Sequence, residues 1–438
     1  MSKKSGLCPP QGGHALLTAT AASAAIESGR LTSEALVSAC LERIAARETD
    51  VQAWAWVDAD QALAQARARD REPRRSWLHG IPVGIKDVID TADMPTGYGS
   101  PIYTGHRPAA DAACVAQIRE LGGVILGKTV STEFATRHPN KTRNPRCLTQ
   151  TPGGSSSGSG AAVADFMVPL ALGTQTSSSV IRPAAYCGVV GYKPGFGLIN
   201  RAGMKFLAES LDTIGVLSRC VSDAGMMVAL LAGLPVGPEA FRPGAAPRIG
   251  LCRTPWWTEA SVPAQRSLED CAARFAEAGA SVKAVEPPAE FAGLNKAQIQ
   301  ISSFEFFRAL SWERTQFPDK ISASLTQRIA AGGRVSRTEY ESALALTRRC
   351  REWMDKEMAA FDLIMAPSAP GEAPDISGTG EPTFGLMWTL LQMPCMTLPC
   401  GVGPSGLPLG VQLVAAPGND TGLYRDAAWA ESVLSRRD

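Results

Sequence analysis

The chain has 438 residues, of which 45% are hydrophobic and 19% charged, a composition typical of a folded globular protein. Lys and Arg total 43 against 42 for Asp and Glu, so no net charge draws the protein to nucleic acid or to an anionic membrane. No apolar run approaches the roughly eighteen residues of a membrane span. The N-terminal thirty residues, interrupted by Pro, Gly and polar residues, make a poor signal peptide. We therefore expect neither a nucleic-acid nor a membrane partner.

The cysteines indicate the compartment. There are 11 of them, with no C-x-x-C pair and no Cys/His spacing typical of zinc. An odd number favours free thiols and a reducing environment, so we expect a cytoplasmic protein. Cys187, within the apolar segment "AAYCGVVGYKP", is expected to be a packed core thiol rather than a nucleophile.

The predicted elements alternate along the chain. Residues 31–48 have the spacing of an amphipathic helix that Thr32 or Ser33 caps. Runs of β-branched residues bounded by Gly or Pro predict strands within residues 80–92, 122–130, 189–195 and 246–254. Periodic helical stretches separate several of these strands.

A change of composition follows a cluster of turn residues near position 240. Residues 262–360 are mostly helical in pattern, and strand-like runs return at residues 362–370 and 406–417. This return predicts one sheet interrupted by an insertion. We expect an α/β protein with a large twisted mixed sheet covered by helices on both faces, forming a single domain over residues 1–438 with a helical insertion at residues 240–360.

The segment "TPGGSSSGSGAAVA", residues 151–164, is crowded with serine and glycine. A phosphate-binding loop is disfavoured, because no Lys follows the glycines and the preceding "RNPRCLTQTP" is not a strand. The chain has only 4 His, none in a metal-binding spacing, so we expect no metal and no cofactor. The same shortage argues against a Ser-His-Asp hydrolase. Another base has to activate a serine.

Lys86 is the candidate base. It is flanked by Ile81, Val83, Ile85 and Val88 in a predicted buried strand, where burial lowers the pKa of a lysine toward neutrality. Judged on this local pattern alone, an ion pair with Asp87 or an edge-strand lysine facing solvent is favoured.

Several blocks taken together resemble one family. "GGSSSGSGAAVADFMVPLALGTQTSSSVIRPAAYCGVVGYKP" and "GIPVGIKDVIDTADMPT" are similar to the central blocks of the amidase signature family. "GKTVSTEFA", "TRNPRC", "SLDTIGVLSR" and "LPLGVQLVAAPGND" resemble further family blocks in the same order. The likeness frames residues 80–220 and 360–420, with the signature core and the catalytic residues expected within residues 70–220.

The resemblance implies a Ser-cisSer-Lys triad. By motif, Lys86 is the base, Ser155 the cis-serine and Ser179 the nucleophile. A middle serine can relay a proton between an attacking oxygen and a lysine that is too far away to take it directly. Gly153 and Gly154 give the turn room, and we also expect Gly154 and Ser156 to contact the substrate.

Backbone N–H groups of Thr176, Ser177, Ser178 and Ser179 are expected to form an oxyanion hole. Most family members carry two glycines where this chain has Ser177 and Ser178, so the turn has to accept two additional Cβ atoms.

Arg182 lies three residues after the nucleophile, as in malonamidase-type members, where an arginine at this place receives the substrate carboxylate. The alternative is that Arg182 ties the loop to a neighbouring acid. Asp212 and Lys193 are expected to be structural.

These likenesses imply a serine-dependent amidohydrolase that cleaves the C–N bond of small amides or carbamates (an amidase or urethanase) through an acyl-enzyme, and a homodimer is a compatible assembly. One alternative is an amidotransferase-type subunit that delivers ammonia to a partner. We favour the free-standing hydrolase, because the chain is somewhat short and neutral for a role on tRNA. Another alternative is a catalytically silent ligand-binding member of the same fold. Residues 200–210 and an aromatic group in the helical insertion are candidates for the variable pocket wall, although core packing is expected for most of the aromatic side chains: Phe304, Phe306, Phe307 and Trp312.

Overall fold

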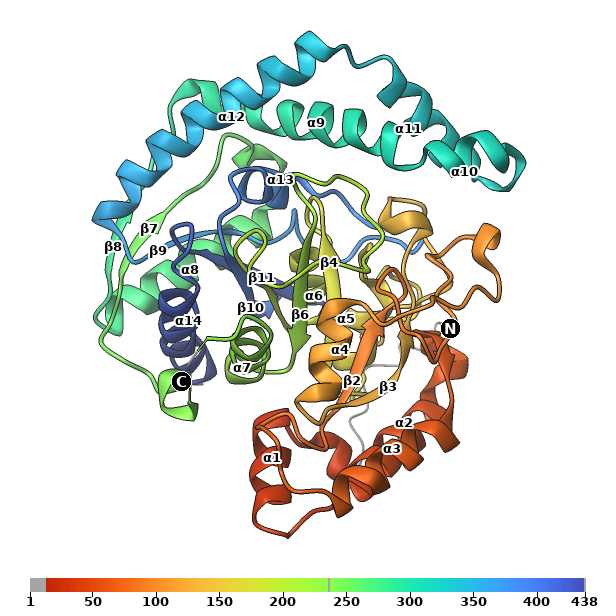
Figure 1. Cartoon of the computed structure of the whole chain (residues 1–438). Helices are drawn as coiled ribbons and strands as arrows, with labels where there is room; N and C mark the ends of the chain where they lie inside the picture. Colours follow the sequence, from red (N-terminus) through yellow and green to blue (C-terminus); the bar gives the residue numbers. More distant parts are fainter. Residues whose placement is uncertain (1–12, 235–236, 437–438) are drawn as a thin grey trace.

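One mixed sheet runs through the computed structural model, which describes residues 13–234 and 237–436 (Figure 1). Its eleven strands are β1 (Trp54–Val57), β2 (Pro82–Lys86), β3 (Val124–Thr129), β4 (Leu170–Gln175), β5 (Val190–Lys193), β6 (Thr213–Ser218), β7 (Arg248–Leu251), β8 (Ser281–Ala284), β9 (Leu363–Pro367), β10 (Cys395–Val402) and β11 (Pro408–Val414). Their order is β1-β3-β2-β4-β6-β5-β10-β11-β9-β7-β8. The late strands rejoin the early ones, which confirms the prediction of a single interrupted sheet.

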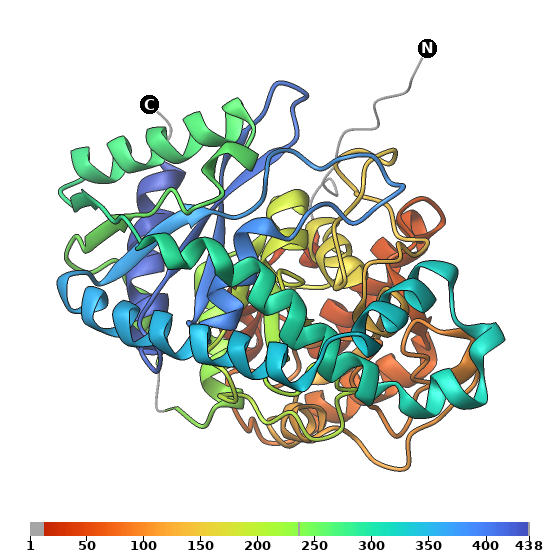
Figure 2. The ribbon, with the colours of Figure 1, turned by 90° about the horizontal axis from the view of Figure 1, so that it is seen from above.

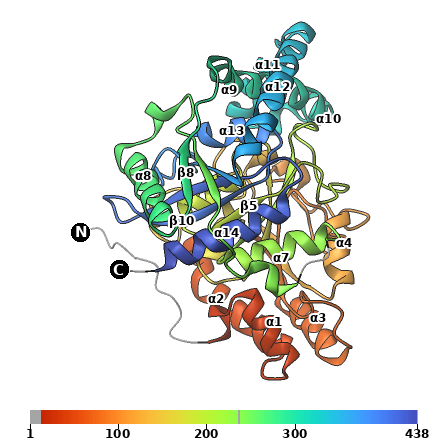
Figure 3. The same ribbon diagram turned by 90° about the vertical axis from the view of Figure 1, so that its left-hand side faces the viewer.

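Helices cover both faces of this sheet, as predicted. They are α1 (Ala19–Glu27), α2 (Ser33–Val51), α3 (Ala59–Arg71), α4 (Ala113–Glu120), α5 (Ser157–Ala164), α6 (Ile181–Cys187), α7 (Val221–Leu231), α8 (Val262–Glu277), α9 (Leu294–Ala309), α10 (Ser311–Gln316), α11 (Ala323–Gly333), α12 (Arg337–Glu357), α13 (Thr383–Leu390) and α14 (Asp420–Ser435). Strand alternation separates two cores. Leu170 and Leu172 pack in the core that contains α7 and α14, which lie side by side in Figure 3, whereas Ala171 packs with α5 and α6.

Helix α2 matches the predicted N-terminal helix. Thr32 is its cap, because the Thr32 side chain accepts a hydrogen bond of 3.1 Å from the backbone N–H of Ala35. Leu36, Val37 and Ile44 form part of its buried face. The first twelve residues, which include much of the stretch considered as a signal peptide, lie outside the described residues.

Residues 240–360 contribute more than helices to the fold. Strands β7 and β8 pair in parallel within this segment, and β7 also pairs with β9. The remainder, α9 to α12 (residues 294–357), forms a layer over one edge of the sheet, and we call this layer the helical cover. Helices α11 and α12 both contact α9, and α9 and α12 run alongside one another across the molecule when it is seen from above (Figure 2).

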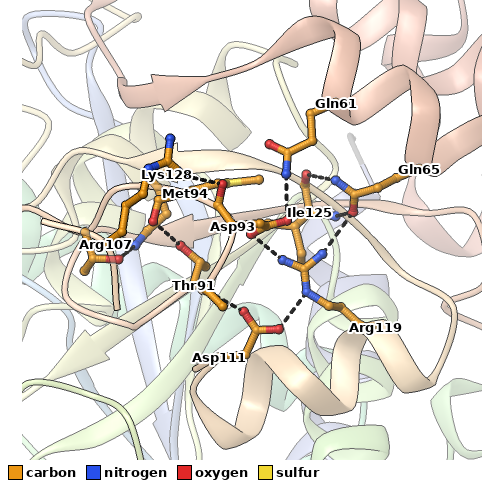
Figure 4. Close-up of polar contacts among 12 residues, drawn as sticks. Gln61, Gln65, Thr91, Asp93, Met94, Arg107, Asp111, Arg119, Ile125 and Lys128 are labelled. Atoms are coloured by element: carbon orange, nitrogen blue, oxygen red, sulfur yellow. Dashed lines mark hydrogen bonds and ion pairs between the residues drawn. The ribbon is translucent and has the colours of Figure 1, made fainter. Parts of the chain in front are cut away.

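A polar network fixes the loop that follows β2 (Figure 4). Arg119 on α4 donates to Asp93 at 2.6 Å and to Asp111 at 2.8 Å. Gln61 on α3 donates to the same Asp93 at 2.8 Å, and Arg107 donates to the Asp93 carbonyl at 2.7 Å. Because the loop is held from two helices, the end of β2 has a fixed continuation.

Two properties of the described part of the chain bear on the sequence analysis. No helix in residues 13–234 and 237–436 is long and apolar enough to cross a membrane. Cys187 is fully buried, which raises the pKa of its thiol to about 12, and the thiol donates to the carbonyl of Pro152. This confirms Cys187 as a core thiol.

Candidate active site

The candidate site lies where two parallel strands end. β2 and β4 are neighbours and run in parallel, so their carboxyl ends meet at one edge of the sheet. Lys86 is the last residue of β2, and the segment from Thr176 to Ser179 directly follows β4. The sheet register therefore brings together residues that are some ninety positions apart in sequence.

Lys86 is fully buried and bonded to hydroxyl groups. Its Nζ lies 2.7 Å from Ser155 Oγ and 2.7 Å from Thr174 Oγ1. Burial lowers the pKa of Lys86 well below its ordinary value of 10.5, and the negative charge of Asp212 opposes this shift. A lysine in this setting is in the form that accepts a proton.

The simpler interpretations of Lys86 were wrong. β2 lies inside the sheet between β3 and β4, so Lys86 is not an edge-strand residue facing solvent. Asp87 does not pair with Lys86. Its carboxylate accepts from the backbone N–H of Gly97 and lies 3.4 Å from Lys128 Nζ. Successive side chains of an extended chain point to opposite sides, which separates the two neighbours.

Ser155 follows a cis peptide bond from Gly154, as the family resemblance implied. Gly153 has a φ of 84°, and a Cβ atom at this position would lie 2.8 Å from the Cα atom of Pro183. Only glycine combines this backbone angle with so close an approach. Ser156, the next residue, accepts from the Thr174 N–H at 3.2 Å and donates to the Thr174 carbonyl at 3.2 Å. Ser155 and Ser156 therefore lie against the end of β4.

Ser179 lines a cavity of about 270 Å³ together with Thr176 and Ser177. The backbone N–H groups of Ser177, Ser178 and Ser179 find no acceptor among the residues that the structure describes. A turn with unpaired N–H donors beside a serine hydroxyl is suited to an oxygen that gains negative charge.

Three guanidinium groups line the same cavity. They belong to Arg137, Arg182 and Arg328, and no described acidic residue lines the cavity with them. Arg182 is buried, which lowers its pKa to about 10. Its Nη2 donates to the Gly154 carbonyl at 2.6 Å, whereas its Nε and Nη1 have no partner within the described chain.

Arg182 therefore does not tie the loop to a neighbouring acid: its bonds run to the Gly154 carbonyl and to Thr379 Oγ1, at 3.4 Å. Arg328 on α11 has the ring of Phe306 within 5.4 Å and no carboxylate within ion-pair distance in the described part of the chain. Arg137 pairs with the exposed Glu381 at 3.1 Å. Unpartnered buried donors at a cavity wall indicate a place for a ligand.

Several residues that sequence reasoning treated as background support the site. The Asp212 carboxylate accepts from Thr176 Oγ1 at 2.5 Å and from the N–H groups of Leu207 and Ala208. Burial raises the pKa of Asp212 to about 6. Leu207, within the region expected to form the variable wall, lines the cavity. Lys193 lies outside the cavity wall and donates to the Pro194 carbonyl at 3.1 Å.

Thr174, Gln298 and Arg328 were missed by the sequence analysis. Thr174 belongs to the block that contains the nucleophile, so its position two residues before Thr176 was an available signal. Gln298 and Arg328 come from the helical cover, where no local motif distinguishes them. The aromatic residues of the cover do not line this cavity. Phe304 stacks on Tyr340 and Phe306 is buried in the core, so the expectation of packing is confirmed for both.

A family model described as Amidase matches residues 35–424. The chain belongs to the amidase signature family. A Glutamyl-tRNA(Gln) amidotransferase subunit of Acidothermus cellulolyticus is 33% identical to this amidase, across 96% of this chain and 95% of that protein. The corresponding protein of Anaeromyxobacter sp. (strain K) is 31% identical across 94% and 95%. Length thus does not separate this chain from such subunits, contrary to our expectation.

Solved structures agree with the fold of this amidase. The peptide amidase from Stenotrophomonas maltophilia has a TM-score of 0.83 and 29% identity, across 97% of this chain and 98% of that one. A chain of the vestigial protein complex related to the origins of an s-triazine catabolic enzyme has a TM-score of 0.88 and 26% identity, across 95% and 98%. Membership of the family supports enzymatic cleavage of an amide C–N bond.

Proposed function

We propose that the protein is a serine amidohydrolase that acts on small amides bearing an anionic group. The observation that carries the proposal is the contact between Lys86 Nζ and Ser155 Oγ at 2.7 Å, at the same strand ends as Ser179 and its cavity. A neutral lysine bonded to a serine hydroxyl forms a base and a proton relay.

The reaction we infer begins with attack of Ser179 Oγ on the carbonyl carbon. The Ser179 proton passes to Ser155 Oγ, whose own proton passes to Lys86 Nζ. The oxygen that gains negative charge is bound by N–H groups of the turn formed by residues 176–179. Lys86 then returns a proton through Ser155 to the leaving nitrogen, and the C–N bond breaks. Water hydrolyses the acyl-enzyme by the same relay.

The anionic part of the substrate is inferred from the three arginines of the cavity. Guanidinium groups bind carboxylates through charge-assisted hydrogen bonds, and Arg182 has two unpartnered nitrogen atoms. We infer that Arg182 receives a carboxylate and that the helical cover, through Arg328, forms the opposite wall. Carbamates remain substrates of the same chemistry, because their carbonyl is attacked in the same way. Gly154 takes part through its carbonyl, which holds Arg182.

The test is release of amine or ammonia by the purified protein from four compounds: malonamate, an aliphatic amide, an aryl acylamide and an aryl carbamate. We expect turnover that is highest for malonamate and is lost in Ser179→Ala. Intact hydrolysis in Ser179→Ala would refute the serine mechanism. Preference for a neutral aryl substrate would refute the anionic class but keep the hydrolase.

A second candidate is favoured by the relatives that are amidotransferase subunits. In this case the chain releases ammonia only within a complex. Turnover by the isolated chain, combined with light scattering that gives the mass of one or two copies of the 46.2 kDa chain, would favour the free-standing hydrolase. Binding of a panel compound to the isolated chain without any turnover would favour the amidotransferase role or a silent binding protein.

A further inference from the structure

Two helices hold the turn of residues 176–179 from different directions. Gln298 of α9 is buried, and its Nε2 donates to the carbonyl of Thr176 at 2.8 Å and to Ser177 Oγ at 3.1 Å. Thr389 of α13 donates from its hydroxyl to the carbonyl of Ser177 at 2.7 Å. Two consecutive carbonyl groups of the turn are thus bound by side chains from far along the chain.

The Thr389 contact belongs to a longer chain of bonds. Gln175 Nε2 donates to Thr389 Oγ1 at 2.9 Å, and Gln175 Oε1 accepts from the N–H groups of Val180 at 2.8 Å and Ile181 at 3.1 Å. Gln175 therefore joins both ends of the loop to α13. Its N–H partners are those just after Ser179, so the N–H groups of residues 177–179 remain unpaired.

The planarity of the peptide group connects these contacts to the unpaired N–H groups. In a trans peptide unit, the carbonyl of one residue and the N–H of the next point in opposite directions. Holding the Thr176 carbonyl against Gln298 therefore directs the N–H of Ser177 away from α9. Holding the Ser177 carbonyl against Thr389 directs the N–H of Ser178 away from α13. Each side chain sets the orientation of one donor.

We propose that Gln298 and Thr389 are positioning residues for oxyanion stabilisation, each holding one carbonyl of the turn so that the following N–H faces the reacting oxygen. This inference rests on the proposed function. It assigns the helical cover a part in the reaction itself, besides forming the wall of the cavity. Ser177 adds a third tie, because its hydroxyl accepts from Gln298 at 3.1 Å.

The test uses Gln298→Met, which keeps the length of the side chain without a donor, and Thr389→Val, which keeps its shape without the hydroxyl. We expect each to lower kcat roughly tenfold or more with KM changed less than about twofold, because a donor of this kind acts in the transition state. Thr389→Ser keeps the hydroxyl and is expected to retain kcat within about threefold. Gln300→Met on the same helix, where Gln300 does not line the cavity, is the matched control.

Three outcomes would overturn the inference: KM rises with kcat unchanged, Gln300→Met loses as much kcat as Gln298→Met, or Thr389→Ser fails to restore kcat. The acid limb of the pH profile is expected to stay in place in both variants, because neither contacts Lys86.

Reaction of Ser179 with a fluorophosphonate gives a second measurement that needs no substrate. Ser179 Oγ bonds to phosphorus and fluoride leaves, with the serine proton passing to Lys86 through Ser155. We expect Gln298→Met and Thr389→Val to slow this labelling, and an unchanged rate in both would overturn the inference. If the unaltered protein neither labels nor turns over any amide, the proposed function fails first. If it does both and the variants match it, only the positioning role fails.

Discussion

Ser178 and Gly385 occupy adjoining space that admits only one side chain. A Cβ atom on Gly385 would lie 2.4 Å from both Cβ and Oγ of Ser178 and 2.9 Å from the carbonyl oxygen of Ser177. Helix α13 can therefore approach the turn that precedes the nucleophile because residue 385 has no side chain. The Cβ that Ser178 brings to this turn is accommodated by a glycine more than two hundred residues away.

Gly385→Ala is expected to destabilise the protein by about 1–3 kcal/mol, the usual effect of overpacking a buried contact. The free energy of unfolding in urea measures this loss. Adding Ser178→Gly should restore part of it, since the clash with the Ser178 side chain disappears and the one with the Ser177 carbonyl remains. Gly378→Ala, at a position with open space around it, is the control. A double variant as unstable as Gly385→Ala would contradict this account.

The pH dependence of kcat/KM should show that Lys86 is neutral in the active protein. Burial lowers the pKa of Lys86 below 10.5, so the neutral fraction grows as pH rises through this lowered value. We expect an acid limb that lies well below pH 10.5 and a plateau above it, with near-total loss in Lys86→Ala. A rate that is flat from about pH 6 to 10, with chemistry limiting, counts against the lysine base.

Stability provides an independent measure of the same lysine. In the unfolded chain Lys86 binds a proton below 10.5, whereas the folded state binds it only at lower pH. The penalty on folding therefore grows as pH falls from 10.5 toward the folded pKa and then stays constant. Lys86→Met lacks this penalty, so its Tm relative to the unaltered protein should increase as pH is lowered through that window. A constant Tm difference would contradict a lowered pKa.

Asp212→Asn should move the acid limb to lower pH. The Asp212 charge raises the pKa of Lys86, so its removal lowers that pKa further. The amide keeps the shape of the carboxylate, but its NH2 group cannot accept from the Leu207 and Ala208 N–H groups. The plateau rate is therefore expected to fall as well. An acid limb that does not move would show that Asp212 acts only through the loop.

Arg328→Met should distinguish anionic from neutral substrates. Arg328 has no described carboxylate partner and lines the cavity, so its removal costs a charge-assisted contact to an anionic substrate alone. We expect KM for malonamate to rise roughly tenfold or more, with little change for an aliphatic amide. Arg334→Met, in which an exposed arginine just beyond α11 is replaced, is the matched control. Equal effects on both substrates would point to a packing role for Arg328.

Local sequence patterns predicted the elements that carry their own signals. The strand around Lys86 was predictable from its run of apolar residues between Gly80 and the polar residues that follow, and helix α2 from its periodicity and its Thr32 cap. The adjacent pair Lys86 and Asp87 was misread, because a local pattern does not show that Asp87 faces Lys128 while Lys86 faces Ser155.

What the sequence by itself determined was the set of reactive groups: a lysine in an apolar strand, serines in a glycine-rich turn, and the family blocks that join them. Only the tertiary structure decided which distant side chains surround them. Gln298, Arg328, Thr389 and Gly385 come from helices that carry no motif, and they reach the turn because the helical cover and α13 pack across the edge where β2 and β4 end. Short-range patterns report burial and turn chemistry, whereas the direction of a carbonyl or an unpaired guanidinium depends on contacts between segments hundreds of residues apart.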